Sequence, residues 1–248
     1  GKKDEYGLFA VALTPEQGRE LVAQQKKSGY DFIKVYDGLK QEVYEAIMDE
    51  SKQQQIDVVG HVPNLVPVSK AIESGQKSIE HLTGYNTWKN WQVSPIDEDY
   101  AAIAASSETW NCPTFYNLAL NGSIEMGKAV ITDARLSALL PDGLIKIWRK
   151  RIDGISKDAM ELIKTNGANN TEVMRTMVLN LYKSNSKLVA GTDAGSLPFL
   201  VPGYSLHQEL RLMTEGGIPT YEVLKMTTVN AALAMNKDTE FGTVEVGK

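Results

Sequence analysis

Four ionisable residues stand at or near the ends of segments that read as β-strands, and their types could bind a metal ion. Lys34 lies within FIKVY, His61 follows IDVVG, His81 follows SIE, and Asp193 ends LVAGTD. Neutral imidazole suits zinc and similar divalent ions. A carboxylate beside such an ion can take the proton of a coordinated water and pass it to a leaving group. Because the carboxyl ends of parallel barrel strands meet at one face, we expect these four side chains to converge there.

Lys34 has an unusual setting for a lysine. Period-two alternation places Phe32, Lys34 and Tyr36 on one face of the strand, and Ile33 and Val35 on the other. A lysine in a strand is more often an edge residue whose ammonium reaches water. Apolar neighbours on both sides instead predict a buried amine, whose pKa desolvation would lower. A neutral amine can react with carbon dioxide to form a carbamate, an anionic ligand with two oxygens that can bridge metal ions.

The other candidates also have ordinary structural interpretations. A single histidine near a strand end is more often a hydrogen-bonded core residue than a ligand, and an aspartate between glycines often caps a turn. The chain has only three histidines, and two of them stand at corresponding strand ends, which favours ligands. The third, His207, begins a predicted helix; we expect it to contact the substrate or support the site, with a solvated helix residue as the equal alternative.

The elements that must position these residues alternate between strand and helix. We expect strands at 8–13, 31–36, 56–61, 78–81, 109–114 and 187–193, helices at 14–28, 40–54, 66–74, 204–215 and 219–235, two or more inserted helices within 115–186, and the start of a further β unit at 241–248. Strands and helices repeated with short loops predict an α/β fold with a parallel sheet. No Gly-x-Gly-x-x-Gly follows a strand, which disfavours a nucleotide-binding sheet.

A (β/α)8 TIM barrel is typical of about 250 residues, but the number of strands is too small for a whole one. Five strands are predicted from residue 31 onward and one short strand before it. The pattern therefore predicts a partial TIM barrel, about strands 4 to 8 with their helices, with strands 1 to 3 missing. We expect residues 1–248 to form a single incomplete barrel domain.

The composition excludes several classes of function. The chain of 248 residues has a net charge of −5, so a broad basic surface for nucleic acid or anionic membranes is not expected. No apolar run is long enough to span a bilayer, and no signal peptide is visible, which leaves both cytoplasm and export open. The single cysteine, Cys112, rules out an intramolecular disulfide and a multi-cysteine metal cluster.

Taken together, the motifs resemble the amidohydrolase superfamily, specifically its imidazolonepropionase-like and prolidase-like branch. The matching segments are GYDFIKVY, VVGHVP, GQKSIEHLTG, CPT and GTDAGSLPFLVPGYSLHQELRLMTEGGIPTYEVLKMTTVNAA, and residues 115–186 are the least distinctive part. The resemblance implies a hydrolase of C–N bonds that uses a divalent metal, zinc above all, in one or two sites. It implies that Lys34 is carboxylated in two-metal members and bridges the metals, and that His61 and His81 bind the second metal. Asp193 would bind the first metal and act as the catalytic acid and base.

One departure from the family pattern concerns the first metal. The family's first strand ends in a His-x-His pair, and this sequence contains no such pair. By resemblance the chain begins just before strand four and ends where relatives enter a small β-sandwich, which predicts a piece of a longer hydrolase. Its activity as it stands depends on that first metal site. Open sheet edges predict that the chain associates as a homo-oligomer, recruits the missing segment, or leaves parts disordered.

Three hypotheses follow for the function. The leading one is a metal-dependent hydrolase acting on a small-molecule amide such as a dipeptide, an acyl-amino acid or a cyclic amide. The second is a non-catalytic binding or assembly fragment of such a barrel, and the third is an aldolase that forms a Schiff base on Lys34. Substrate contacts are expected from loops at the strand ends, at Tyr36, Tyr85, Tyr204 and His207, with Asn64 and Tyr116 as further candidates.

Overall fold

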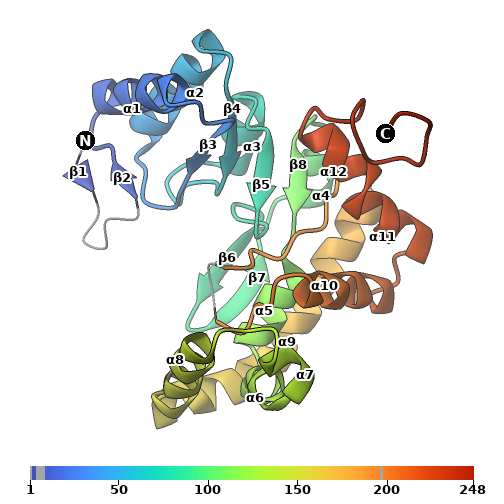
Figure 1. Ribbon diagram of the computed structural model, residues 1–248. Helices are drawn as coiled ribbons and strands as arrows, with labels where there is room; N and C mark the ends of the chain where they lie inside the picture. Colours follow the sequence, from blue (N-terminus) through green and yellow to red (C-terminus); the bar gives the residue numbers. More distant parts are fainter. Residues whose placement is uncertain (1, 4–8, 196–197) are drawn as a thin grey trace. The chain divides into compact units, whose positions relative to one another are not determined.

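A computed structural model describes residues 2–3, 9–195 and 198–248, which fold into strands and helices in two compact units (Figure 1). Unit 1 is made of Gly1–Asn86, Ile96–Cys112 and Ser184–Leu188, and unit 2 of Thr87–Pro95, Pro113–Lys183 and Val189–Lys248. The predicted α/β class is confirmed. The prediction of a single barrel domain stays a prediction.

The first part of unit 1 contains a short antiparallel strand pair, two helices that lie side by side, and a pair of parallel strands (Figure 1). The elements are β1 (Lys2–Lys3), β2 (Ala10–Val11), α1 (Pro15–Lys27), β3 (Phe32–Val35), α2 (Gln41–Gln53) and β4 (Asp57–Gly60). Helix α1 starts as the sequence predicts, because the Thr14 hydroxyl accepts a hydrogen bond from the Gln17 amide and a proline occupies the first turn. Strands β3 and β4 pair with Lys34 opposite Val59.

The alternation predicted for β3 is confirmed, but the predicted burial of Lys34 is wrong. Ile33 and Val35 are 5% and 3% exposed, whereas Lys34 and Tyr36 are exposed. Their partner strand follows the same pattern, since Val58 is buried and Val59 is only half-buried. Only one face of the β3–β4 pair is fully buried in the described part of unit 1, and Lys34 lies on the other face.

A second pair of parallel strands continues the first. Unit 1 also contains α3 (Val68–Glu73), β5 (Ser78–Glu80), α4 (Tyr100–Ala105) and β8 (Trp110–Cys112). Strand β5 pairs with β8, and the amide of Lys77 donates to the carbonyl of Val58 at 2.7 Å, which joins β5 to β4. The described strands β3–β4 and β5–β8 are thus two parallel pairs, linked by this hydrogen bond next to the start of β5.

The strand expected at 187–193 is mostly absent, which corrects the prediction. Leu188 alone forms a parallel bridge with Asn111. Two residues later, the amide of Ala190 donates to the carbonyl of Met226, in a helix, so the backbone has left strand pairing.

Unit 2 is mainly helical (Figure 1). Its elements are β6 (Asn86–Lys89), whose first residue belongs to unit 1, β7 (Gln92–Pro95), α5 (Phe115–Asn121), α6 (Ile124–Thr132), α7 (Ala134–Ser137), α8 (Asp142–Asp153), α9 (Lys157–Lys183), α10 (Tyr204–Glu215), α11 (Thr220–Thr227) and α12 (Val229–Ala234). The helices expected within 115–186 are confirmed. The β6–β7 hairpin and helix α4 were not expected from the sequence. Helix α9 is long, yet neither it nor any other described helix has the apolar length needed to cross a bilayer.

Helix α9 organises unit 2 through small and polar contacts. A Cβ at Gly167 would lie 1.9 Å from the carbonyl oxygen of Gly122, so α9 passes the end of α5 at a distance that only glycine allows. On β7, the amide of Val93 donates to Asn170, whose own amide donates to the carbonyl of Trp91.

The two ends of the chain differ from the expected strands. Of the strand expected at 8–13, Leu8 lies outside the described residues, and only Ala10–Val11 is extended and paired, antiparallel to β1. Residues 241–248 form turns and bends rather than a β unit, and Val244 and Val246 are fully exposed there. No described strand pairs with this segment, so its backbone has no partner for a β-ladder.

Candidate active site

The β3–β4 register brings the residues that follow the two strands together. Val35 pairs with Gly60, and beyond this pair the amide of His61 donates to the carbonyl of Val35 at 3.0 Å. Further out, the amide of Asn64 donates to the carbonyl of Asp37, also at 3.0 Å. Gly60 has φ of 116°, and a Cβ there would lie 2.4 Å from the oxygen of Val35. Glycine is therefore required at the position that directs His61 out of the strand.

His61 is held between a carboxylate and an aromatic ring. Its Nδ1 lies 2.6 Å from Oδ1 of Asp37, and the ring of Tyr36 stacks on the imidazole with centroids 4.0 Å apart and planes inclined by 26°. His61 is only 7% exposed. Its Nε2 is buried and has no hydrogen-bond partner in the described part of the chain.

His81 lies next to His61, as the sequence predicts for two ligands of one ion. The ring centroids are 4.9 Å apart, and the rings meet edge to face. The amide of His81 donates to the carbonyl of Cys112 at the end of β8. His81 and Leu82 have φ values of 59° and 54°, a left-handed backbone that is strained for residues other than glycine. Such strain persists where the surrounding structure imposes it, often at functional sites.

Two polar side chains that sequence analysis missed tie the histidine loops together. The hydroxyl of Thr83 accepts a hydrogen bond from the amide of Val62 at 3.0 Å. The side-chain amide of Gln76 donates to the carbonyls of Gly60, His61 and Ser78.

Gln76 also accepts a hydrogen bond from the hydroxyl of Tyr44 at 2.8 Å. Gln76 and Tyr44 are almost entirely buried, at 1% and 0% exposure, and burial raises the pKa of Tyr44. Asp37 was missed as well. Neither Asp37 nor Gln76 belongs to a hydrophobic periodic pattern, so no signal in the sequence identifies them.

Lys34 lies near Tyr36, which in turn contacts His61 of the histidine pair. Its Nζ is 5.4 Å from the centroid of the Tyr36 ring, the ring that stacks on His61. The structure therefore brings Lys34, Tyr36, His61 and His81 together within unit 1.

Tyr85, expected to contact substrate, lies in the core of unit 1 instead. It is 0% exposed, its ring lies 6.3 Å from that of Tyr100, and burial raises its pKa. The sequence predicts that Tyr85 faces a substrate from the loop after β5, but its ring turns inward into the core. In this arrangement its ring is closed to a substrate.

Asp193 belongs to unit 2, where it contacts helix α5. Its Oδ2 accepts a hydrogen bond from the side-chain amide of Asn117 at 3.4 Å, and its φ of 57° is left-handed. Asn121 in turn donates to Oδ1 of Asn117 at 2.8 Å, which sets the orientation of that amide. Because Asp193 and the two histidines belong to different units, the predicted four-residue ligand set stays a prediction.

A second buried carboxylate, not anticipated from the sequence, supports the same helix. Glu209 on α10 is 0% exposed, and its two oxygens accept the amides of Phe115 and Tyr116 at the start of α5. Burial raises the pKa of Glu209 to about 7, although the two N–H donors favour the charged form.

Three of the other predicted substrate contacts, Tyr116, Tyr204 and His207, lie in α5 and at the start of α10. Tyr204 is half-buried and His207 is exposed, the state expected of a solvated helix residue. Tyr116 is buried, and burial together with the nearby Tyr204 raises its pKa to about 12. Asn64, in unit 1, is exposed.

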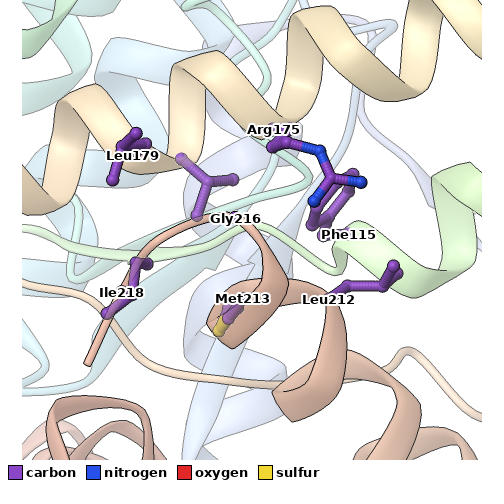
Figure 2. Close-up of a pocket in the computed structure, with 8 residues that line it drawn as sticks. Phe115, Arg175, Leu179, Leu212, Met213, Gly216 and Ile218 are labelled. Carbon is purple, nitrogen blue, oxygen red and sulfur yellow. The ribbon is translucent and has the colours of Figure 1, made fainter. Parts of the chain in front are cut away.

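The shallow depression in unit 2 shown in Figure 2 contains none of the predicted site residues. It encloses about 150 Å³, part of it open to solvent, and is lined by Phe115, Arg175, Val178, Leu179, Leu212, Met213, Gly216 and Ile218. The guanidinium of Arg175 lies over the ring of Phe115, 5.8 Å from its centroid (Figure 2). We interpret this depression as a small gap left where the helices of unit 2 pack against one another.

The comparison with known families decides the identity of the fold. Residues 17–248 match the amidohydrolase family. The chain belongs to the amidohydrolase family. No curated protein sequence matches it.

Several solved structures share the amidohydrolase fold of the chain. A bottromycin amidohydrolase is 25% identical with a TM-score of 0.69, and the match covers 94% of this chain and 52% of that one. A Xaa-Pro dipeptidase with bound methionine is 19% identical with a TM-score of 0.60, covering 96% and 52%. A prolidase complexed with N-methylphosphonate-L-proline is 18% identical with a TM-score of 0.63, covering 97% and 52%. The chain thus spans about half the length of these proteins.

Members of the amidohydrolase family are generally metal-dependent. Within the described residues, no three side chains from histidine, cysteine, aspartate and glutamate are grouped so that they could hold a metal ion. The histidine pair of unit 1 accounts for two of the predicted ligands. The predicted ligand Lys34 is not counted in such a group, which is made of histidine, cysteine, aspartate and glutamate only.

Proposed function

We propose that the chain is part of a metal-dependent hydrolase that cleaves C–N bonds in amide, peptide or cyclic amide substrates. Membership of the amidohydrolase family supports the reaction class. The observation that carries the metal dependence is the buried Nε2 of His61, which lacks a hydrogen-bond partner among the described residues and belongs to a ring 4.9 Å from that of His81.

The histidine pair fits a divalent ion on chemical grounds. Leaving a buried polar nitrogen unpaired costs about 1–3 kcal/mol, and a metal bond would offset this cost. Two neutral imidazoles suit zinc in particular. His61 and His81 would hold the second ion of the family pattern, with Lys34 as a further ligand, and Asp193 would be a ligand of the first ion. When bound, the ion would polarise the substrate carbonyl and lower the pKa of a coordinated water.

The remaining roles fall to residues of the chain itself. Asp193 would accept a proton from the attacking water and deliver it to the leaving nitrogen, as a general base and then a general acid. The side-chain amide of Asn117 would orient that carboxylate through its hydrogen bond to Oδ2. Tyr36, Tyr204 and His207 would contact the substrate, whereas the buried Tyr85 is removed from that set.

Lys34 enters this proposal as a carbamate. The Lys34 side chain is exposed and lies over the Tyr36 ring, so the apolar burial that the sequence predicted for its amine is not found in the structure. The carbamate would therefore form together with metal binding, because coordination stabilises the anion. This makes Lys34 a conditional ligand, in contrast to the histidines.

The fold supports a placement of these strands within a barrel. We infer that β3, β4, β5 and β8 correspond to strands 4 to 7 of a TIM barrel and that the segment from Leu188 begins strand 8.

The similar structures include a Xaa-Pro dipeptidase and a prolidase bound to a proline phosphonate. A dipeptide or acyl-amino acid with proline after the cleaved bond is accordingly the first substrate to try.

A hydrolysis assay tests this function. The chain, loaded with zinc, is incubated with Xaa-Pro dipeptides and N-acyl-prolines, and release of the amine is followed with and without a chelator. We expect zinc-dependent release that D193N abolishes. A second candidate function is that of a non-catalytic binding or assembly fragment of such a barrel. Zinc binding without any turnover would support this candidate and contradict hydrolysis.

A further inference from the structure

We propose that Asp37 is a positioning residue that holds His61 in the tautomer with a proton on Nδ1, so that the lone pair of Nε2 faces the metal position. The inference rests on the proposed function for the metal, but the carboxylate–imidazole pair is itself a feature of the structure.

The backbone gives Asp37 a fixed place beside His61. Asp37 lies two residues beyond the end of β3, and His61 directly follows β4. The carbonyl of Asp37 accepts the amide of Asn64, and the amide of His61 donates to Val35. The two segments are therefore held to each other on both sides of the 2.6 Å contact between Oδ1 and Nδ1.

The ring of His61 has little freedom to turn. Tyr36 stacks on one face at 4.0 Å, and His81 meets the imidazole edge to face at 4.9 Å. With Nδ1 on the carboxylate, the opposite nitrogen is directed away from Asp37 into the buried space where it has no partner in the described chain. A histidine ligand whose second nitrogen donates to a carboxylate is the usual arrangement around protein-bound metals.

A plain ion pair is the alternative explanation of the same contact. In that case the imidazole would be charged, and Nε2 would carry a proton. The Nε2 position is buried and has no acceptor among the described residues, so this proton would be left without a hydrogen bond. The Asp37 side chain is 44% exposed, and ion pairs of such partly exposed groups contribute little to stability. The geometry therefore favours an imidazole whose Nδ1 donates to Asp37 and whose Nε2 is directed at the metal position.

Zinc titration of the 248-residue chain tests the effect of Asp37 on the metal. We expect D37A to weaken zinc binding about 10–100-fold, with a smaller loss for D37N, whose amide oxygen can still accept from Nδ1. The matched control is D49N, because Asp49 is an aspartate of the same unit that is 61% exposed and pairs with Arg19. Equal zinc affinity of wild type, D37A and D49N would overturn the proposal.

The tautomer of His61 in the zinc-free chain supplies a second, independent measurement. Nitrogen chemical shifts of the imidazole are recorded above the usual histidine pKa of about 6.5. They should show the proton on Nδ1 in wild type. In D37A they should show it on Nε2, or divided between the two nitrogens in a mixture of tautomers. A charged ring or an Nε2 proton in wild type would overturn the proposal even if zinc binds. If wild type binds no zinc, the proposed metal function fails, and the tautomer still decides the role of Asp37.

Discussion

The hydroxyl of Thr83 accepts a hydrogen bond from the backbone amide of Val62, and this single contact joins the loop that follows His61 to the loop that follows His81. The same hydroxyl donates to the carbonyl of Glu80 at 3.0 Å, so Thr83 spans both loops with one oxygen atom. Val62 is 2% exposed, and water cannot readily replace the contact. Thr83 therefore helps Gln76 to hold the two histidine loops together, although it is not itself a predicted metal ligand.

Replacing Thr83 with valine should separate the two loops. T83V keeps the shape of the side chain but leaves the buried amide of Val62 unpaired, which costs about 1–2 kcal/mol. We expect a lower urea midpoint and a several-fold loss of zinc affinity. T83S retains the hydroxyl and should behave like wild type in both measurements. A T83V protein with unchanged zinc affinity would show that the loops hold their positions without this bond.

Gln76 should be the most sensitive polar residue of unit 1. Q76L removes the donor to three carbonyls and the acceptor for Tyr44, and we expect a loss of about 2–3 kcal/mol in the free energy of unfolding. Y44F removes one of these bonds and should cost about 1 kcal/mol. Q53L, at the exposed end of α2, is the matched control. Similar urea midpoints for Q76L and Q53L would contradict this role.

The strands of unit 1 could be predicted because hydrophobic alternation and turn residues coincide there. Ile33, Val35 and Val58 form the buried face of β3–β4, and the predicted strand is confirmed to within a residue or two at each end. The β6–β7 hairpin was missed because its turn, Asn90-Trp91, has left-handed φ at both residues without the glycine that usually marks such a turn. The predicted strand at 187–193 is longer than the structure allows, because an apolar run does not show whether a neighbouring strand is present to pair with it.

The candidate site was predicted in part. Two histidines at successive strand ends were enough to place His61 beside His81, because parallel strands in register bring their ends together. Asp37 and Thr83 could not be predicted, since each acts through one hydrogen bond that only the loop conformation creates. The burial of Lys34 was predicted wrongly because alternation tells which residues share a face, but not whether that face is covered.

The stability of unit 2 should fall as pH rises through the titration of Glu209. Burial raises the pKa of Glu209 to about 7, above the ordinary value of 4.5 that it regains on unfolding. Below the ordinary value both states hold the proton, and the contribution to stability is fully present. Between the two values the unfolded chain loses the proton first, so stability is lost with rising pH until the folded pKa is passed.

The difference between wild type and E209Q isolates this effect. Glutamine resembles the protonated acid, so the two proteins should have similar stability near about pH 4. Towards about pH 8, wild type should lose stability relative to E209Q, on the order of 3 kcal/mol. Thermal unfolding across this range measures the difference. A difference that moves in favour of wild type as pH rises would show that the amides of Phe115 and Tyr116 outweigh burial.

Bicarbonate should strengthen zinc binding through Lys34. If the amine of Lys34 becomes a carbamate only when a metal is present, added bicarbonate supplies the missing carbon dioxide and raises the apparent zinc affinity of wild type. K34R keeps the charge but cannot form the carbamate in the same way, so its affinity should not respond. Calorimetric titrations with and without bicarbonate make the comparison. An equal response of both proteins would remove Lys34 from the ligand set.

Zinc binding by the histidine variants tests the central claim most directly. The chain has three histidines, which makes H207A a control of the same chemistry on an exposed helix residue of the other unit. Metal content after equilibrium dialysis, measured together with calorimetric affinity, should show zinc bound by wild type and H207A and no measurable binding by H61A or H81A. Zinc retained by H61A and H81A at the level of wild type would contradict the account.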